Sequence, residues 1–322
     1  MASKLDSLRE HTVVVADTGE VDAIRQYQPN DCTTNPTLLL KAAQSDAYRP
    51  LVDQAIARAN ASSAADVDRV CDELAVTFGS ELLKIVPGYV STEVDADLSF
   101  DADATVAKAE RLIERYDALG ADTDRVLIKI ASTWEGIRAA ETLAKRGVKC
   151  NLTLMFGMPQ AVACAEAGVH LVSPFVGRIR DWYQAQGHTD IEGDADPGVR
   201  FVRRVYAYYK RHGYKTIVMG ASFRTLSEIE CLAGCDRLTI SPHLLDQLSK
   251  EDGPLARRLG DDTAAQGEDR IAMDEIRFRW HMNEDAMATE KLAEGIRQFN
   301  ADLVSLKSLL AGMIAQPSRA TA

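Results

Sequence analysis

Residues 125–154 read RVLIKIASTWEGIRAAETLAKRGVKCNLTL, in which two apolar runs flank an amphipathic segment. The runs Arg125–Ala131 and Val148–Leu154 show no regular polar alternation, which is typical of parallel strands that are covered on both faces. Between them, Trp134–Arg146 has apolar residues at helical spacing and ends before Gly147, a usual C-terminal stop. The stretch therefore predicts a strand, a helix and a second strand parallel to the first.

The same strand–helix unit recurs along the chain and indicates the fold class. We expect eight strands, at Thr12–Ala16, Asp31–Thr34, Leu82–Val90, Arg125–Ala131, Val148–Leu154, His170–Pro174, Thr216–Gly220 and Arg237–Ile240. Further helices are expected at Thr105–Leu119, Pro159–Ala167, Pro197–His212, Thr225–Ala233 and Glu284–Leu310. Eight alternations with short connections favour an α/β fold, a (β/α)8 TIM barrel. The alternative is an open doubly wound sheet, but no GxGxxG follows any expected strand, so its dinucleotide-binding form has no support.

Length alone would allow two domains in 322 residues, but no linker or shift in composition marks a boundary. We therefore expect residues 1–322 to form one domain. The segments Ala43–Thr77 and Ser249–Gln266 are interpreted as extra helices or loops on that domain. A long C-terminal helix is expected at about 284–310, followed by a loose tail of the last ~10 residues.

Composition excludes some classes of partner. The chain has 37 Lys and Arg against 48 Asp and Glu, a formal net charge of −11, which disfavours nucleic acid and anionic membranes. The stretch 203–211 mixes basic and aromatic residues, as some nucleic-acid binders do. At the helical period, however, Val205, Tyr208 and Tyr209 fall on a core face. We expect no nucleic-acid and no membrane partner.

The cysteines and the first residues of the chain indicate a cytoplasmic location. Six scattered cysteines form no CxxC pair, so reduced and mostly buried thiols are expected. The first twelve residues contain acidic side chains and no apolar core of a signal peptide. Cys231 and Cys235 are one helical turn apart, which would suit half of a metal site, but no second Cys or His pair completes it. The six histidines show no ligand spacing either, and we expect no metal and no cofactor.

In a (β/α)8 barrel the active site lies at the carboxyl ends of the strands, so polar residues at those ends are the candidates. Every expected strand supplies at least one. In chain order they are Asp17, Thr33, Thr34, Asn35, Glu93, Lys129, Asn151, Thr153, Ser173, Arg178, Ser222, Arg224 and Ser241. We expect these side chains to meet at one mouth of the barrel.

Lys129 interrupts the otherwise apolar run Val126–Ala131. Desolvating an ammonium group is costly, so this position favours the neutral amine that imine formation with a carbonyl requires. The alternative is a buried lysine that pairs with a carboxylate, and Glu93 on the preceding strand is available for it. The strand by itself leaves both interpretations open.

The other charged candidates also have two interpretations. Asp17 and Glu93 are candidates for general acid and base chemistry. Asp17 is alternatively a helix N-cap, and Glu93 an ion-pair partner. The run Thr33–Pro36 is alternatively a turn that starts a helix. Arg178 and Arg224 are candidates for a bidentate phosphate clamp, although surface arginines are common.

Several segments together resemble the transaldolase family. They are DCTTNPTL (31–38), VSTEVDA (90–96), VLIKIASTWEG (126–136), CNLTL (150–154), SPFVGRI (173–179) and MGASFR (219–224), with RW (279–280) and NEDAMA (283–288) near the end. The resemblance covers roughly residues 1–312 in order and spacing. It implies a class I aldolase barrel and a pentose phosphate pathway transferase. Such an enzyme moves a dihydroxyacetone unit from sedoheptulose 7-phosphate to glyceraldehyde 3-phosphate, giving erythrose 4-phosphate and fructose 6-phosphate.

The resemblance also implies a role for each candidate. Lys129 matches the Schiff-base lysine, Glu93 the acid/base that acts through a water, and Asp17 the group that takes the C4 hydroxyl proton. The substrate-binding set is implied to be Thr33, Asn35, Asn151, Thr153, Ser173, Phe175, Arg178, Ser222 and Arg224. Family members are sugar-phosphate enzymes, and a homodimer is plausible from the resemblance.

Phe175 bears on the choice between two related activities. By family analogy, an apolar residue there suits a transferase, whereas a Tyr suits a fructose 6-phosphate aldolase that releases free dihydroxyacetone. A catalytically silent sugar-phosphate-binding barrel is a third alternative, opposed by the presence of Lys129, Glu93 and Asp17. Departures from the family pattern include Tyr89 and Asp97, where Arg is common, and residues 157–159. Because the first two remove positive charge, we expect any effect to fall on substrate affinity.

Overall fold

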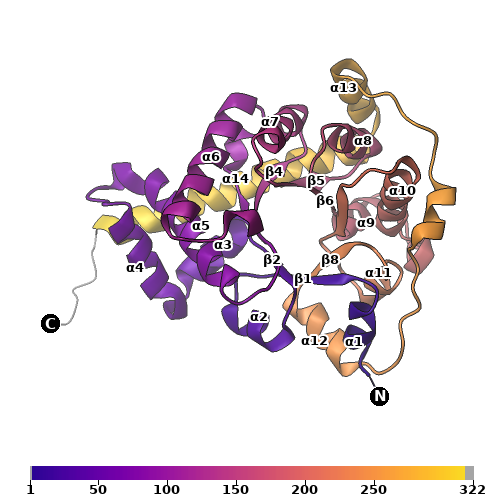
Figure 1. Ribbon diagram of the computed structural model, residues 1–322, viewed down its shortest axis with the longest axis horizontal. Helices are drawn as coiled ribbons and strands as arrows, with labels where there is room; N and C mark the ends of the chain where they lie inside the picture. Colours follow the sequence, from indigo (N-terminus) through magenta and orange to yellow (C-terminus); the bar gives the residue numbers. More distant parts are fainter. Residues whose placement is uncertain (1, 316–322) are drawn as a thin grey trace.

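The structure is a computed structural model that describes residues 2–315. Its centre is a closed barrel of eight parallel strands, each hydrogen-bonded to its chain neighbours and β8 to β1 (Figure 1). The strands are β1 Val13–Asp17, β2 Asp31–Thr33, β3 Val90–Glu93, β4 Val126–Ala131, β5 Cys150–Met155, β6 Leu171–Pro174, β7 Ile217–Gly220 and β8 Arg237–Ile240. The predicted (β/α)8 barrel is confirmed, while the prediction of a single domain stays a prediction.

Helices surround the barrel (Figure 1). They are α1 Lys4–Arg9, α2 Val21–Tyr27, α3 Pro36–Gln44, α4 Arg49–Arg58, α5 Val67–Leu83, α6 Ala102–Ala118, α7 Trp134–Lys145, α8 Met158–Glu166, α9 Val176–Ala185, α10 Pro197–His212, α11 Leu226–Glu230, α12 Pro242–Lys250, α13 Glu275–Glu284 and α14 Ala286–Ala315. On α10, Val205, Tyr208 and Tyr209 are fully buried and Arg204 and Arg211 form surface ion pairs, which confirms the expected core face.

Alternation along the strands divides the core into an inner and an outer set. Val15, Leu127, Leu171 and Met219 form a separate buried cluster, whereas their neighbours such as Ile128 pack with the helices. Because side chains alternate between faces, the residue two positions further along each strand also faces inward. On β1, β4 and β6 these next inward residues are Asp17, Lys129 and Ser173. The apolar cluster thus forms a floor beneath a polar layer.

Several element boundaries differ from the sequence prediction. The strand expected at Leu82–Val90 is wrong, because α5 continues to Leu83 and β3 begins only at Val90. The apolar run there satisfies the helical period, and the chain breaks at Pro87 and Gly88. α11 ends at Glu230, before the expected Ala233.

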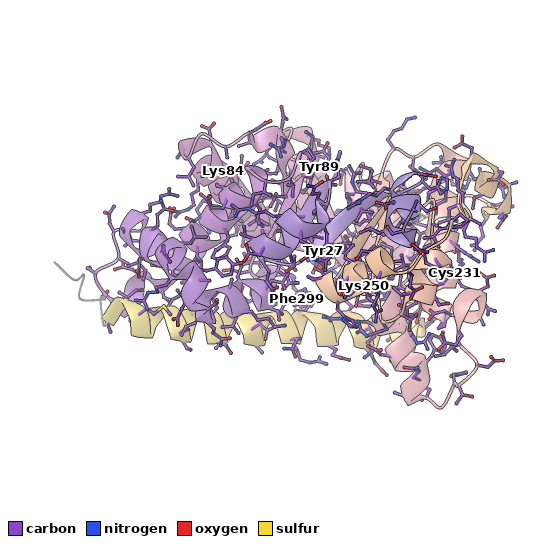
Figure 2. The ribbon with its side chains drawn as sticks, turned by 90° about the horizontal axis from the view of Figure 1, so that it is seen from below. Tyr27, Lys84, Tyr89, Cys231, Lys250 and Phe299 are labelled. Carbon is purple, nitrogen blue, oxygen red and sulfur yellow. The ribbon has the colours of Figure 1, made fainter. Side chains whose placement is uncertain are left out.

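The C-terminal helix also differs from the prediction. α13 ends at Glu284, the chain turns at Asp285, and α14 then runs from Ala286 to Ala315. Residues 313–315 of the expected tail are therefore helical, and the rest of it, 316–322, lies outside the described residues. α14 runs along one whole side of the molecule (Figure 2).

The two expected insertions are helical additions to the barrel. Segment 43–77 contains α4 and the first part of α5, and both helices share a buried apolar cluster with α14. Segment 249–266 ends in a 3₁₀ helix, Asp261–Gln266, that packs against α10. All six cysteines are free and buried. Within residues 2–315, no helix is both long and apolar enough to span a bilayer.

Candidate active site

A cavity of about 180 Å³ opens at the carboxyl ends of the strands and gathers most of the candidate residues. Its lining includes Asp17, Thr33, Asn35, Lys129, Thr153, Ser173, Phe175, Arg178 and Ser222. Of the twelve residues assigned a role, three do not line it: the buried Asn151, Glu93, and Arg224, which is exposed. Of the thirteen polar residues expected to meet at one mouth, eight therefore line the cavity; the five that do not are Thr34, Glu93, Asn151, Arg224 and Ser241.

Lys129 occupies the polar layer of β4 and is 4% exposed. Strand register places it directly between Glu93 of β3 and Asn151 of β5. Its Nζ lies 3.3 Å from Glu93 Oε2 and 3.4 Å from the Thr34 carbonyl oxygen. The buried ion pair that was left open as an alternative is thus present. The same lysine also lines the cavity, so the pair does not remove it from reach of a ligand.

Burial raises the pKa of the Glu93 carboxyl above its ordinary value, and the nearby positive charge of Lys129 opposes this shift. The pKa of Asp17 is also raised by burial, again against the charge of Lys129. The Thr33 hydroxyl donates to Asp17 Oδ1 over 3.2 Å. Both carboxyls therefore hold a proton more readily than exposed ones do, which suits groups that give and take protons.

The interpretation of Asp17 as a helix cap is wrong. The N-cap of α2 is Glu20, and its backbone N–H donates to the Thr18 hydroxyl over 3.0 Å. The interpretation of Thr33–Pro36 as a turn that starts a helix holds in part. α3 begins at Pro36, and Asn35 Oδ1 accepts a hydrogen bond from the Leu38 N–H over 2.9 Å. Capping uses only this oxygen, so the Asn35 amide donors remain available at the cavity.

A hydrogen-bonded chain runs beside the lysine and joins side chains of β6, β5 and β3. Ser173 Oγ donates to Asn151 Oδ1 over 2.6 Å, and Asn151 Nδ2 donates to Ser91 Oγ over 3.1 Å. Both polar ends of the fully buried Asn151 are thereby used. Thr153 differs, since its buried Oγ1 has no hydrogen-bond partner among the described residues. A buried hydroxyl of this kind is suited to hold a water or a substrate group.

The two arginines differ in their surroundings. Arg178 is half-buried, burial lowers its pKa, and it forms no hydrogen bond or ion pair within residues 2–315. Its guanidinium carbon lies 5.2 Å from the centre of the Phe175 ring. The exposed Arg224 donates to both carboxylate oxygens of Asp181, at 2.7 and 3.2 Å, and to Ser222 Oγ at 3.2 Å. Arg178 is therefore the arginine whose donors face the cavity unused.

The loop after β7 and the start of α9 fit closely together. Ser222 has a φ of 63°, in the left-handed region, and its carbonyl oxygen accepts the Gly177 N–H over 2.9 Å. A Cβ at Gly177 would lie 2.2 Å from that oxygen and 2.7 Å from Arg224 Cγ. Only glycine therefore allows this approach, which places Ser222 beside Arg178.

Sequence reasoning missed Thr239 and Phe299, which both line the cavity. Thr239 forms a hydrogen bond of 3.1 Å with the Thr33 hydroxyl, and strand alternation in β8 was the signal that could have found it. The residue named instead, Ser241, is the N-cap of α12 and does not line the cavity. Phe299 comes from α14, and no local pattern indicates where that helix crosses the barrel.

The expected influence of Tyr89 on substrate affinity is not supported by its position. Tyr89 precedes β3, so it lies at the amino end of the barrel, packed with the apolar floor. Its ring centre is 5.3 Å from that of His170. Figure 2 shows Tyr89 and Phe299 on opposite sides of the barrel. Asp97, by contrast, is exposed on the carboxyl-end side.

Comparison with known proteins finds one matching family model and several similar sequences that cover nearly the whole chain. A family model described as Transaldolase/Fructose-6-phosphate aldolase matches residues 14–310. The chain is 58% identical to a transaldolase of Marinobacter nauticus over 95% of this chain and 97% of the relative. It is 57% identical to a transaldolase of Pseudoalteromonas atlantica, over 96% and 99% of the two chains. A transaldolase of Vibrio cholerae is 56% identical, over 98% and 100%.

Proposed function

Because the chain belongs to the transaldolase/fructose-6-phosphate aldolase family, we propose that its barrel mouth transfers a dihydroxyacetone unit between sugar phosphates. It is a transferase of the transaldolase type. The donor is sedoheptulose 7-phosphate and the acceptor glyceraldehyde 3-phosphate, as in the pentose phosphate pathway. The observation that carries the assignment to this site is the buried Lys129 amine at the cavity, 3.3 Å from Glu93.

The first half-reaction attaches the ketose to the protein. The Lys129 amine attacks the C2 carbonyl and passes one of its protons to the carbonyl oxygen. Glu93 delivers a second proton to that oxygen through a water, and the oxygen leaves as water to give the protonated imine. Thr153 Oγ1, buried without a hydrogen-bond partner among the described residues, supports the role of holding the relaying water. The product is an imine between Lys129 and C2 of the sugar.

Carbon–carbon cleavage then uses the imine as an electron sink. Asp17 removes the proton from the C4 hydroxyl, the C3–C4 bond breaks, and its electron pair moves into the imine to form an enamine. The aldehyde product leaves with its new carbonyl at the former C4. An acceptor aldehyde next takes the enamine carbon, and Asp17 returns the proton to the new hydroxyl. Hydrolysis of the final imine releases the ketose and regenerates Lys129.

Residues around the lysine hold the two ends of the substrate. Thr33, Asn35 and Ser173, which line the cavity, are assigned to the hydroxyls of the three-carbon unit. Asn151 is assigned to the same end of the site, where it accepts the hydrogen bond from Ser173. The free donors of Arg178, with Ser222, are assigned to the phosphate, because a guanidinium binds phosphate oxygens bidentately. Arg224 would reach a phosphate only by giving up part of its pairing with Asp181, so it is assigned an outer position in phosphate binding. We assign no cofactor, since the lysine imine supplies the electron sink.

Phe175 supports transfer over release of free dihydroxyacetone. Its ring lines the cavity and packs edge-on against Phe156, with ring centres 5.8 Å apart. An apolar ring provides no hydroxyl that could activate water against the enamine. The enamine therefore persists until an aldehyde arrives, which is what a transferase requires.

Two wider assignments belong to the same proposal. We propose a cytoplasmic location, which is supported by six buried cysteines that remain free thiols. We also propose a homodimer, which is supported by the large exposed side chains Phe100, Ile276 and Trp280. Light scattering of the purified protein measures the assembly directly, and a mass of one chain would contradict the dimer.

The function is tested by turnover with two matched variants. The purified protein is given fructose 6-phosphate and erythrose 4-phosphate, and sedoheptulose 7-phosphate is measured. Glu93→Gln and Asp17→Asn should each lower kcat by about 10²–10⁴-fold. Asp17→Asn should still form the imine, whereas Glu93→Gln should form it slowly. Formation of free dihydroxyacetone at the same rate with and without acceptor would contradict transfer and indicate an aldolase.

A further inference from the structure

The C-terminal helix supplies an aromatic side chain to the cavity. Phe299 of α14 lines the barrel mouth and is 3% exposed. Figure 2 labels Phe299 at α14, the long helix that runs along this side of the molecule and carries this residue. It is thus a cavity residue that follows no barrel strand.

One ring contacts both cations of the site. The centre of the Phe299 ring lies 5.8 Å from Lys129 Nζ and 5.5 Å from Arg178 Cζ. A cation within about 6 Å of a ring face is attracted to it, and the attraction grows when water is excluded. The same side chain therefore touches the proposed imine end and the proposed phosphate end of the cavity.

Arg178 is held by two rings rather than by acceptors. Phe175 and Phe299 lie 5.2 and 5.5 Å from its guanidinium carbon. Within the described part of the chain, no carboxylate or carbonyl binds its N–H groups. Aromatic contacts orient a guanidinium without occupying its donors. The arrangement keeps the donors available for an anion while fixing where they lie.

Close packing of α14 determines the position of the ring. Gly295 lies one turn before Phe299, and a Cβ there would lie 2.6 Å from Leu154 Cδ2 and 3.2 Å from Arg178 Nη1. Three residues beyond Phe299, Asp302 accepts a hydrogen bond from the Thr37 hydroxyl of α3. These contacts lie on the two sides of Phe299 along the helix, so the ring has little freedom to move away from the mouth.

We infer that Phe299 is a positioning residue that couples the two ends of the site. It orients Arg178 for the substrate phosphate and covers Lys129 while the enamine waits for its acceptor. The inference rests on the proposed transaldolase reaction. If the cover is lost, the enamine carbon takes a proton from solvent, and water then hydrolyses the resulting imine. That sequence releases free dihydroxyacetone and returns the lysine amine.

The test compares Phe299→Leu with the unaltered protein in three measurements. Leucine keeps an apolar side chain but lacks the ring face. We expect KM for fructose 6-phosphate to rise about three- to tenfold, since one of two cation–ring contacts is lost. Free dihydroxyacetone per transfer should increase. Borohydride trapping with dihydroxyacetone, which has no phosphate, should still label Lys129.

Two further variants separate positioning from general damage. Gly295→Ala keeps the ring, but its Cβ would lie 2.6 Å from Leu154 Cδ2 and 3.2 Å from Arg178 Nη1. It should therefore push α14 away from the barrel and from Arg178, and raise the same KM. Val304→Ala, on the same helix and 54% exposed, should change neither KM nor the amount of free dihydroxyacetone released per transfer. The inference is overturned if both Phe299→Leu and Gly295→Ala retain KM and release no extra dihydroxyacetone. If Phe299→Leu fails to fold, Gly295→Ala decides. Absence of label at Lys129 in the unaltered protein would overturn the proposed function instead.

Discussion

Asp17, Glu93 and Lys129 place two carboxyls and one amine in a barrel interior that water reaches poorly. Burial raises the pKa of both carboxyls, and the lysine charge reduces the shift without cancelling it. The proposed chemistry therefore uses the same two groups that form the buried ion pair Lys129–Glu93. Sequence reasoning expected all three residues at the barrel mouth. Asp17 and Lys129 line the cavity there, whereas Glu93 lies next to it, paired with Lys129. The sequence interpretation treated ion pairing and reactivity as alternatives. The structure shows that Lys129 forms the ion pair and lines the cavity at the same time.

Burial of Asp17 has a consequence for stability that depends on pH. A carboxyl whose pKa is raised in the folded state contributes stability at low pH, and this contribution is lost as pH rises through the folded pKa. Asp17→Asn removes the ionisable group. The free energy of unfolding of the variant should therefore exceed that of the unaltered protein at pH 8. The difference should shrink below about pH 4. Urea unfolding at both pH values measures it, and a variant less stable at pH 8 would contradict the cause given for the shift.

At the scale of elements, the periodicity of the sequence predicted β4, β5, α7 and α10 to within one or two residues. It failed at β3, because the run before Val90 has apolar residues that fit a helix and a strand equally well. It also failed to find Phe299, because the path of α14 is decided by packing against α3, α5 and the barrel rather than by local pattern. Site residues that follow directly after a strand can be predicted from the sequence. A site residue on a helix that crosses the barrel mouth cannot, because its position depends on how the helix packs.

The contact between α9 and the loop after β7 gives a prediction at this scale. Gly177→Ala introduces a Cβ that would lie 2.2 Å from the Ser222 carbonyl oxygen, so the loop must move. We expect the free energy of unfolding to fall by about 1–3 kcal/mol and KM for phosphorylated substrates to rise. Chemical denaturation and steady-state kinetics measure the two effects.

Gly312→Ala is the matched control for this variant. Gly312 lies in α14, and a Cβ there meets nothing within 4 Å. Alanine in a helix should stabilise by up to about 1 kcal/mol and leave KM unchanged. An unchanged KM in Gly177→Ala would show that the loop position does not matter for phosphate binding.

At the scale of the whole molecule, the two ends of the barrel differ. The proposed site lies at the carboxyl ends of the strands, whereas the amino ends carry packed side chains that we expect to contribute to stability. Tyr89 belongs to the amino end, with its ring 5.4 Å from Arg237 Cζ and 5.6 Å from Lys149 Nζ. Net charge is likewise a property of the whole: −11 opposes the approach of phosphate esters, so binding depends on local donors such as Arg178. Neither composition nor family pattern could assign Tyr89 to an end, because the strand boundary at Val90 decides it.

The separation of the two ends predicts the result of Tyr89→Leu. Loss of the ring contacts should lower the free energy of unfolding by about 1 kcal/mol. KM for fructose 6-phosphate should stay unchanged, because the site lies at the other end of the barrel. Thermal unfolding and steady-state kinetics test both parts. A raised KM with normal stability would show that the two ends are coupled.

Covalent trapping tests the role of Lys129 most directly. The protein is incubated with fructose 6-phosphate, reduced with borohydride and digested, and the labelled peptide is identified by mass spectrometry. We predict a three-carbon adduct on Lys129 and no adduct in Lys129→Ala, with Lys84→Ala, an exposed lysine of similar chemistry, labelled as in the unaltered protein. A label on another lysine, or no label while turnover persists, would contradict the mechanism.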